Sequence, residues 1–116
     1  MTVGWWFIEA YTTMAQTPEG RVKDAVKKEL KTRNIWFFMP MQNGMGVVGI
    51  PDFICCDRGQ FIGVETKAPG KRGCTTANQE RTLEAIFEHG GWSIVVDDVQ
   101  QLIEFLEVKN EQRRTN

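Results

Sequence analysis

The stretch that decides the fold is residues 51–67, PDFICCDRGQFIGVETK. Two runs rich in apolar residues, 51–56 and 61–67, flank the tetrapeptide DRGQ at residues 57–60. Polar residues with a glycine between two apolar runs of this length are typical of a tight turn between strands. The stretch therefore predicts a β-hairpin.

The position of the turn decides which side chains face each other across the hairpin. If the loop is residues 58–59, Asp52 faces Glu65, and the two Cβ atoms lie about 4.5–5.5 Å apart. If the loop is residues 59–60, Asp52 faces Lys67 instead, with the glutamate on the diagonal. Because side chains alternate between the two faces of a strand, both registers place all three residues on one face.

Two carboxylates opposed on one sheet face suit a divalent cation. Like charges directly opposite each other destabilise a sheet, and Mg²⁺ is typically held by one or two carboxylates together with water and phosphate oxygens. Such an ion lowers the pKa of a bound water and steadies a leaving oxygen. Lys67 is placed to stabilise the negative charge that develops. Asp52, Glu65 and Lys67 are therefore suited to phosphodiester hydrolysis.

Helices and strands are expected on both sides of the hairpin. Thr17 caps a first helix that begins at Pro18 and ends near Asn34. Thr76 and Gln79 fit a capping box at the start of a second helix. The expected order is a helix over 17–34, a buried strand at 35–39, the hairpin, a helix over 76–89, a strand at 92–96 and a last helix beginning at residues 97–98. Apolar residues at helical spacing predict the inward faces of these helices: Val22, Ala25, Val26 and Leu30; Leu83, Ile86 and Phe87; Val99, Leu102, Ile103 and Leu106.

Both faces of the predicted hairpin are apolar, and such a sheet needs helices on both sides. The fold class that follows is a three-layer α/β fold with a mixed sheet between helices. Its apolar side chains are Ile54 and Cys56 on one face and Phe53, Ile62 and Val64 on the other.

Composition limits the function classes. The 116 residues are 41% hydrophobic with a net charge of -1, so overall charge gives no reason to expect nucleic acid or a membrane, and a local patch must supply any such contact. Three cysteines form no disulfide framework and lack zinc-site spacing, and the single His89 excludes a zinc site built on several histidines. No glycine-rich phosphate loop is present. No stretch is long and apolar enough to span a bilayer, so a cytoplasmic protein without a membrane partner is expected.

The chain is expected to divide into three parts. Residues 1–16 form an aromatic leader that contacts the domain body or a partner subunit. Residues 17–109 form the domain, and residues 110–116 form a polar, frayed tail. The aromatic residues Trp36, Phe37 and Phe38 are expected in the core rather than in base stacking.

The pattern Pro51-Asp52 followed by Glu65-Thr66-Lys67 resembles the PD-(D/E)xK nuclease motif. With Gln79 and the flanking glycines, the sequence resembles more narrowly the virus-type replication-repair nuclease (VRR-NUC) domain, over roughly residues 17–97. The resemblance implies a restriction-endonuclease-like α-β-β-β-α-β core, here with an extra C-terminal helix.

The resemblance also implies roles for individual residues. Asp52 and Glu65 would bind Mg²⁺, for which Mn²⁺ can substitute, together with the backbone carbonyl of Thr66. Lys67 would be the catalytic lysine. Two further positions match the family pattern, Gln79 as a catalytic residue and Glu19 as a possible metal ligand.

Two of these assignments have a structural alternative. Gln79 can serve the capping box, and we expect one side chain not to fill both roles at once. Glu19 can simply favour the positive end of the helix dipole.

The implied activity is a metal-dependent, structure-specific DNA endonuclease. Small stand-alone phage members of this family resemble Holliday-junction resolvases and act as dimers, so branched DNA, a homodimer, a role in DNA repair and a phage-infected or bacterial cell are implied. The residues expected to contact DNA are Lys71 and Arg72 in the loop after the ExK strand and Lys23 and Lys27 on the first helix. The alternatives are a restriction-type nuclease, against which the lack of a long specificity region counts, and a non-catalytic DNA-binding or scaffolding domain, which needs no paired acids.

Overall fold

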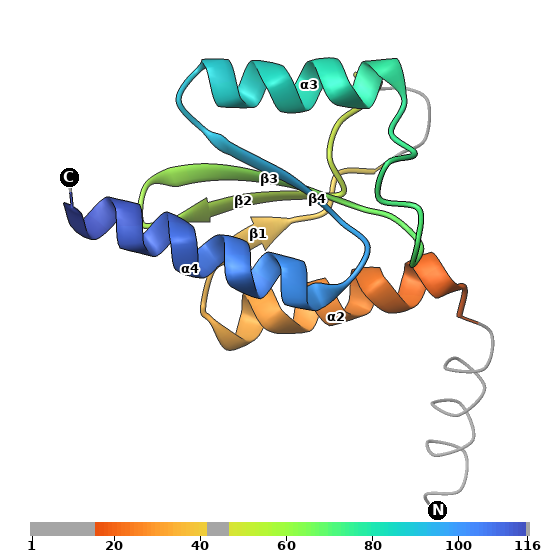
Figure 1. Ribbon diagram of the computed structural model, residues 1–116, viewed down its shortest axis with the longest axis horizontal. Helices are drawn as coiled ribbons and strands as arrows, with labels where there is room; N and C mark the ends of the chain where they lie inside the picture. The colour runs from red at the N-terminus through yellow and green to blue at the C-terminus, as the bar shows by residue number, and fades with distance from the viewer. Residues whose placement is uncertain (1–15, 42–46, 116) are drawn as a thin grey trace, which may run out of the picture.

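The computed structural model describes residues 16–41 and 47–115 and contains one four-stranded sheet with helices on both faces (Figure 1). The three-layer α/β fold predicted above is confirmed. The predicted leader lies almost entirely outside the described residues. In chain order the elements are α2 (Pro18–Thr32), β1 (Trp36–Phe38), β2 (Phe53–Asp57), β3 (Gln60–Thr66), α3 (Ala77–Glu88), β4 (Trp92–Val96) and α4 (Val99–Thr115).

The sheet is mixed, with the strand order β1-β2-β3-β4. The first three strands are antiparallel and β4 runs parallel to β3. Arg58 and Gly59 form the two-residue turn, with φ of 53° and 83°, and Asp57 pairs with Gln60. Two consecutive residues with positive φ are the geometry that joins two-residue hairpins without splaying the strands. Of the two registers considered, the first is therefore correct, in which Asp52 and Glu65 are opposed.

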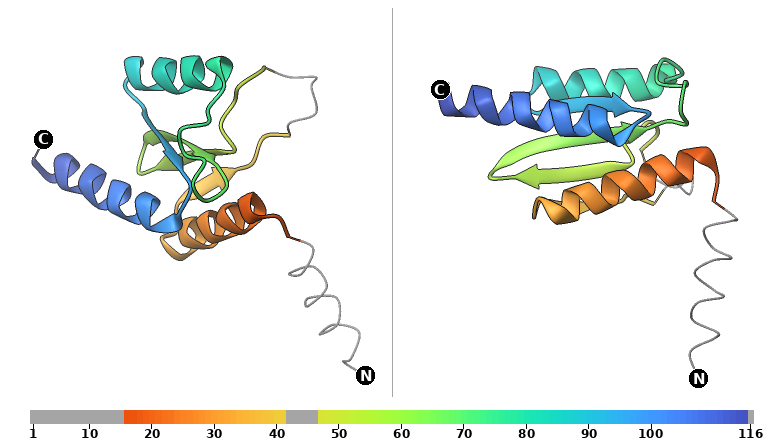
Figure 2. Two further views of the ribbon diagram at one scale, coloured as in Figure 1. Left: turned by 45° about the vertical axis from the view of Figure 1, so that its right-hand side comes forward. Right: turned by 60° about the horizontal axis from the view of Figure 1, so that its bottom comes forward.

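Helices α2 and α4 cover one face of the sheet and α3 covers the other (Figures 1 and 2). The core lies between the sheet and the α2–α4 pair. Its fully buried members are Val26 and Leu30 of α2, Phe53 and Val64 of the hairpin, and Leu102 and Leu106 of α4. The predicted inward faces of α2 and α4 are confirmed by these residues.

The α3 face is covered less completely. Gly63 lets α3 lie close to β3, because a Cβ atom there would come within 2.9 Å of Ile86 Cδ1. None of the residues of α3 is fully buried, and Phe87, expected to point inward, is 66% exposed. Trp36 and Phe38 are also exposed, at 62% and 48%, so their assignment to the core is wrong. The reason is their place at the sheet edge on β1, whereas α3 contacts only β3 and β4.

The ends of the helices follow the local sequence signals except at the C-terminus. The Thr17 side chain caps α2 by accepting a hydrogen bond from Gly20 N at 3.0 Å. The predicted frayed tail from Asn110 is wrong, because α4 continues to Thr115. Arg113 and Arg114 lie in its last turn, where positive charge favours the helix dipole. Among the described residues, no helix has the length and apolar character needed to cross a membrane.

Candidate active site

The open end of the β2–β3 hairpin brings two carboxyl groups together. Asp52 directly precedes β2 and Glu65 is the second-last residue of β3, so the register that pairs Phe53 with Val64 places the two acids opposite each other. Their side chains share a hydrogen bond. Glu65 is only 3% exposed and is held away from bulk water, whereas Asp52 is half-buried. The predicted juxtaposition of the two acids is present.

The carboxylate of Asp52 is held on both of its oxygens. Oδ2 accepts hydrogen bonds from the backbone N–H of Thr66 at 3.0 Å and from its hydroxyl at 2.6 Å. Oδ1 lies 3.6 Å from the ammonium nitrogen of Lys23 on α2. Asp52 is thus oriented by the strand that carries Glu65 and by the first helix.

The environment moves the pKa values of the two acids apart. Burial raises the pKa of Asp52, but hydrogen bonds from Glu65 and Thr66 and the charge of Lys23 outweigh this effect, and its pKa is lowered. Burial, the hydrogen bond to Asp52 and the negative charge of Asp52 raise the pKa of Glu65 to about 8. One proton therefore bridges the acids at neutral pH, which relieves the repulsion between them in the absence of a cation.

Lys67 and Gln79 meet beside this pair. Gln79 Oε1 accepts a hydrogen bond from Lys67 Nζ at 3.0 Å, and the same atom accepts one from the backbone N–H of Thr76 at 3.0 Å. The Thr76 hydroxyl in turn accepts from Gln79 N, which completes the capping box of α3. Gln79 thus completes the cap and also contacts Lys67, because a carbonyl oxygen has two lone pairs and accepts both bonds. Its catalytic role stays a prediction.

The first helix contributes Lys23 to the site rather than only to a basic surface. Lys27, one turn further on, is exposed. Glu19, the possible metal ligand, is half-buried one turn before Lys23. Within residues 16–41 and 47–115, no three His, Cys, Asp or Glu side chains gather as a metal-binding group. The acids of the site are thus the pair from the hairpin, and the role of Glu19 stays a prediction.

The loop after Lys67 is tied to the end of β4. Arg72 Nε donates to the backbone oxygen of Val95 at 2.7 Å, and Gly70 N donates to Asp97 Oδ2 at 2.9 Å. Lys71 is exposed between these two anchors. Arg72 therefore fixes the loop through one nitrogen, and its DNA contact, like that of Lys71, stays a prediction.

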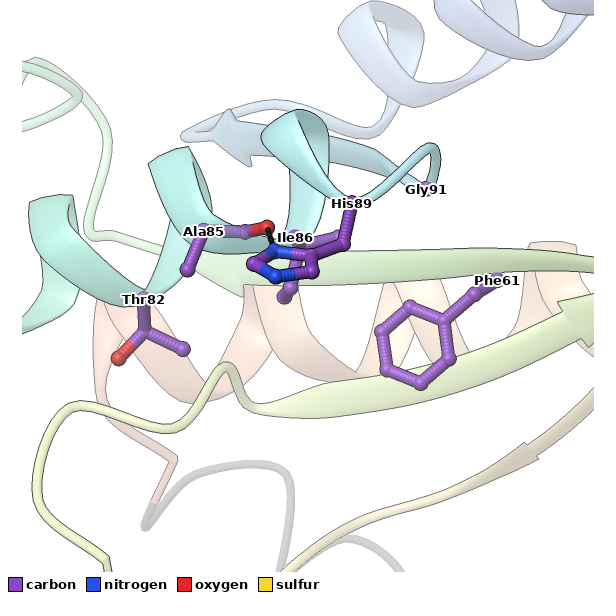
Figure 3. Close-up of a pocket in the computed structure, with 6 residues that line it drawn as sticks. All are labelled: Phe61, Thr82, Ala85, Ile86, His89 and Gly91. Atoms are coloured by element: carbon purple, nitrogen blue, oxygen red, sulfur yellow. Dashed lines mark hydrogen bonds between the residues drawn. The ribbon is translucent and has the colours of Figure 1, made fainter.

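A separate cavity of about 430 Å³ lies between the end of α3 and β3 (Figure 3). Phe61 and Ile86 are among its mostly apolar lining residues, and it lies at the opposite end of β3 from Glu65. His89 lines it and donates from Nδ1 to the carbonyl of Ala85 at 2.8 Å, as expected for a residue at a helix end. This cavity holds no acid and is not the candidate site.

Sequence reasoning missed two lysines. Lys23 was expected only on DNA, and its contact with Asp52 has no local signal, because it depends on how α2 packs across the sheet. Lys109 is fully buried and donates to Asp57 Oδ2 at 3.0 Å and Gln60 Oε1 at 2.8 Å. Lys109 follows the buried residues Leu102 and Leu106 of α4 at helical spacing. This spacing is the one sequence signal that predicts an inward position for it.

One of three comparisons with known proteins agrees with this fold. No family model matches the sequence, and no curated protein matches it. A solved structure described as a "VRR_NUC domain" is similar to this chain, with a TM-score of 0.62 and 26% identity, covering 79% of this chain and 97% of that one. The resemblance recognised in the sequence is confirmed at the level of the fold: this chain has a VRR-NUC fold.

Proposed function

We propose that this chain is a Mg²⁺-dependent DNA endonuclease that hydrolyses phosphodiester bonds. The observation that carries the proposal is the pair of opposed acids, the half-buried Asp52 and the buried Glu65, with the ammonium of Lys67 beside it, on a VRR-NUC fold. A domain that only binds DNA gains nothing from two carboxylates in this position, since they repel both each other and the phosphates.

The donor set fits a hard divalent cation. Asp52 and Glu65 supply carboxylate oxygens from adjacent strands, and Mg²⁺ characteristically takes one or two carboxylates and fills its other positions with water and phosphate oxygens. Positive charge already gathers at this point, where a proton bridges the acids and Lys23 lies 3.6 Å from Asp52 Oδ1. When bound, the ion would activate a water for attack on phosphorus and neutralise charge on the phosphate. Asp52, Glu65 and the backbone carbonyl of Thr66 would hold it.

Lys67 supplies the fixed positive charge of the reaction. Its Nζ is held by Gln79 Oε1, so the ammonium keeps its place beside Glu65 before substrate arrives. A preorganised ammonium stabilises the negative charge that builds on the phosphate oxygens in the transition state. Gln79 in turn is held by the Thr76 cap, so the N-terminus of α3 positions the lysine.

The proposed substrate is DNA, and branched DNA in particular. Lys23 and Lys27 on α2 and Lys71 and Arg72 in the loop after β3 lie on segments that flank the acid pair, where they would contact phosphates. One chain carries one acid pair and cuts one strand. Symmetric cleavage of a four-way junction therefore requires a homodimer.

The test is incubation of the purified full chain with labelled four-way junction, flap and plain duplex DNA in Mg²⁺, Mn²⁺ or EDTA. Cleavage in either cation that EDTA abolishes is expected, with the junction cut in both opposed strands. Asp52→Asn, prepared in parallel, controls for a contaminating nuclease. Binding to all three DNAs without cleavage in any cation would instead support the non-catalytic alternative, and preference for a short duplex sequence would support a restriction-type enzyme.

A further inference from the structure

The two oxygens of Asp52 have different partners. Oδ2 takes both hydrogen bonds from Thr66, which belong to the strand and are short. Oδ1 has an ion pair with Lys23, at 3.6 Å and therefore longer than a hydrogen bond. One oxygen is thus fixed by the backbone, and the other is neutralised by a cation on a flexible stem.

Lys23 is suited to leave that position. Its side chain is 33% exposed, whereas that of Asp52 is 13% exposed. The lysine therefore reaches the acid from the solvent side and can turn away without opening the core. A compact ammonium on four methylenes is the group that can make such a movement at little cost.

We propose that Lys23 is a built-in counter-cation that occupies Asp52 until the metal binds and that the metal must displace. The inference rests on the proposed function, because it assumes that Asp52 is a ligand of the divalent ion. A divalent cation and an ammonium cannot both lie against one carboxylate without strong repulsion. Lys23 therefore lowers the affinity of the site for the metal. In the absence of the metal, Lys23 keeps Asp52 oriented. Once displaced, the ammonium becomes free to contact a DNA phosphate, so its expected DNA contact belongs to the metal-loaded state.

The experiment is calorimetric titration of Mn²⁺ into the metal-free full chain, with no DNA and no cleavage in the readout. Four proteins are compared: the natural sequence, Lys23→Met, Lys23→Arg and Lys28→Met. Lys28 lies on the same helix, is exposed, and its substitution removes the same unit of charge. Lys23→Met should bind Mn²⁺ about two- to tenfold more tightly, the magnitude of one partly exposed ion pair. Lys23→Arg and Lys28→Met should bind within about twofold of the natural sequence.

The possible outcomes separate the two proposals. Unchanged or weaker Mn²⁺ binding by Lys23→Met overturns the counter-cation role and leaves the proposed nuclease intact. Tighter binding by Lys28→Met of the same size overturns it too, because the effect would then be one of net charge. If none of the four proteins binds Mn²⁺, the proposed metal site itself fails, and the inference with it. Should Lys23→Met fail to fold by circular dichroism, Lys23→Gln takes its place with the same expectation.

Discussion

The two ends of the β2–β3 hairpin hold their charged side chains in contrasting arrangements. At the turn end, Asp57 and Gln60 pair across β2 and β3 and both accept a hydrogen bond from Lys109, which is fully buried. A third bond goes to Asn110 Oδ1 at 3.2 Å, so all three protons of this ammonium have a partner. One buried cation meets one acid, and the cluster is complete without any ligand.

At the open end, Asp52 and Glu65 bring two acids together with a bridging proton, and the nearest cations are only partly engaged. Lys23 lies on the exposed side of Asp52, and Lys67 is held by Gln79 rather than by either acid. This difference shows that a buried charged residue does not by itself indicate a functional site. A closed, fully hydrogen-bonded pair stabilises the fold, whereas two opposed acids beside loosely placed cations suit the further ion that we propose.

The largest expected difference between the two ends concerns activity. Lys67→Ala should reduce DNA cleavage by about 100- to 1000-fold or more, because the positive charge that stabilises the transition state is removed. The measurement is the initial rate of junction cleavage in Mg²⁺, with DNA affinity determined separately and expected to change little. A variant with the natural cleavage rate would remove Lys67 from the reaction.

Substitutions at the turn end should instead affect the stability of the fold. Lys109→Met should lower the free energy of unfolding by roughly 3 kcal/mol, because it leaves the Asp57 carboxylate without its buried cation. Urea denaturation measures this change, and the double variant Lys109→Met with Asp57→Asn should recover much of the stability. Equal stability of Lys109→Met and the natural sequence would contradict the structural role of the cluster.

At the open end, the repulsion between Asp52 and Glu65 should make the free energy of unfolding depend on pH. The pKa of Glu65 is raised to about 8 in the folded chain from its ordinary value of 4.5, so the folded state binds the proton more tightly. Its contribution to stability is complete below about pH 4.5 and is lost as pH rises through about 8. In EDTA, the free energy of unfolding should therefore fall by roughly 1 kcal/mol or more between pH 5 and 8.

Glu65→Gln provides the control for that pH dependence, because the amide does not titrate. Its stability should be nearly independent of pH over the same range. Parallel curves for the two proteins would show that the bridging proton contributes nothing to folding.

The smallest effect is expected at the loop beside the open end. Replacing Lys71 and Arg72 together by alanine should weaken DNA binding and reduce the slope of its salt dependence by up to about 2, because each side chain would neutralise one phosphate. Fluorescence anisotropy at several salt concentrations measures the slope. Because Arg72 also holds the loop through Val95, the single variant Lys71→Ala separates the removal of charge from a loosened loop. An unchanged slope in both variants would exclude phosphate binding by this loop.

Local signals were reliable wherever neighbours in sequence decided the structure. The Thr17 and Thr76 caps, the tight turn within residues 57–60, and the apolar stripes of α2 and α4 are all confirmed. Local signals failed where the neighbouring elements of the fold determine whether a side chain is buried. Trp36 is an example, because its exposure follows from the place of β1 at the edge of the sheet.

By itself, the sequence determined that Asp52, Glu65 and Lys67 share one face of the hairpin, because side chains alternate along a strand and both possible two-residue turns preserve that face. The structure then selected the turn at Arg58 and Gly59, in which Asp52 and Glu65 are opposed. It did not determine which lysine meets which acid. Only the tertiary structure decided that Lys23 faces Asp52, that Lys67 is held by Gln79 and that Lys109 is buried against Asp57. The physical reason is that each of these contacts joins separate elements of the fold, so it depends on how α2, α3 and α4 pack on the sheet rather than on any local preference of the chain.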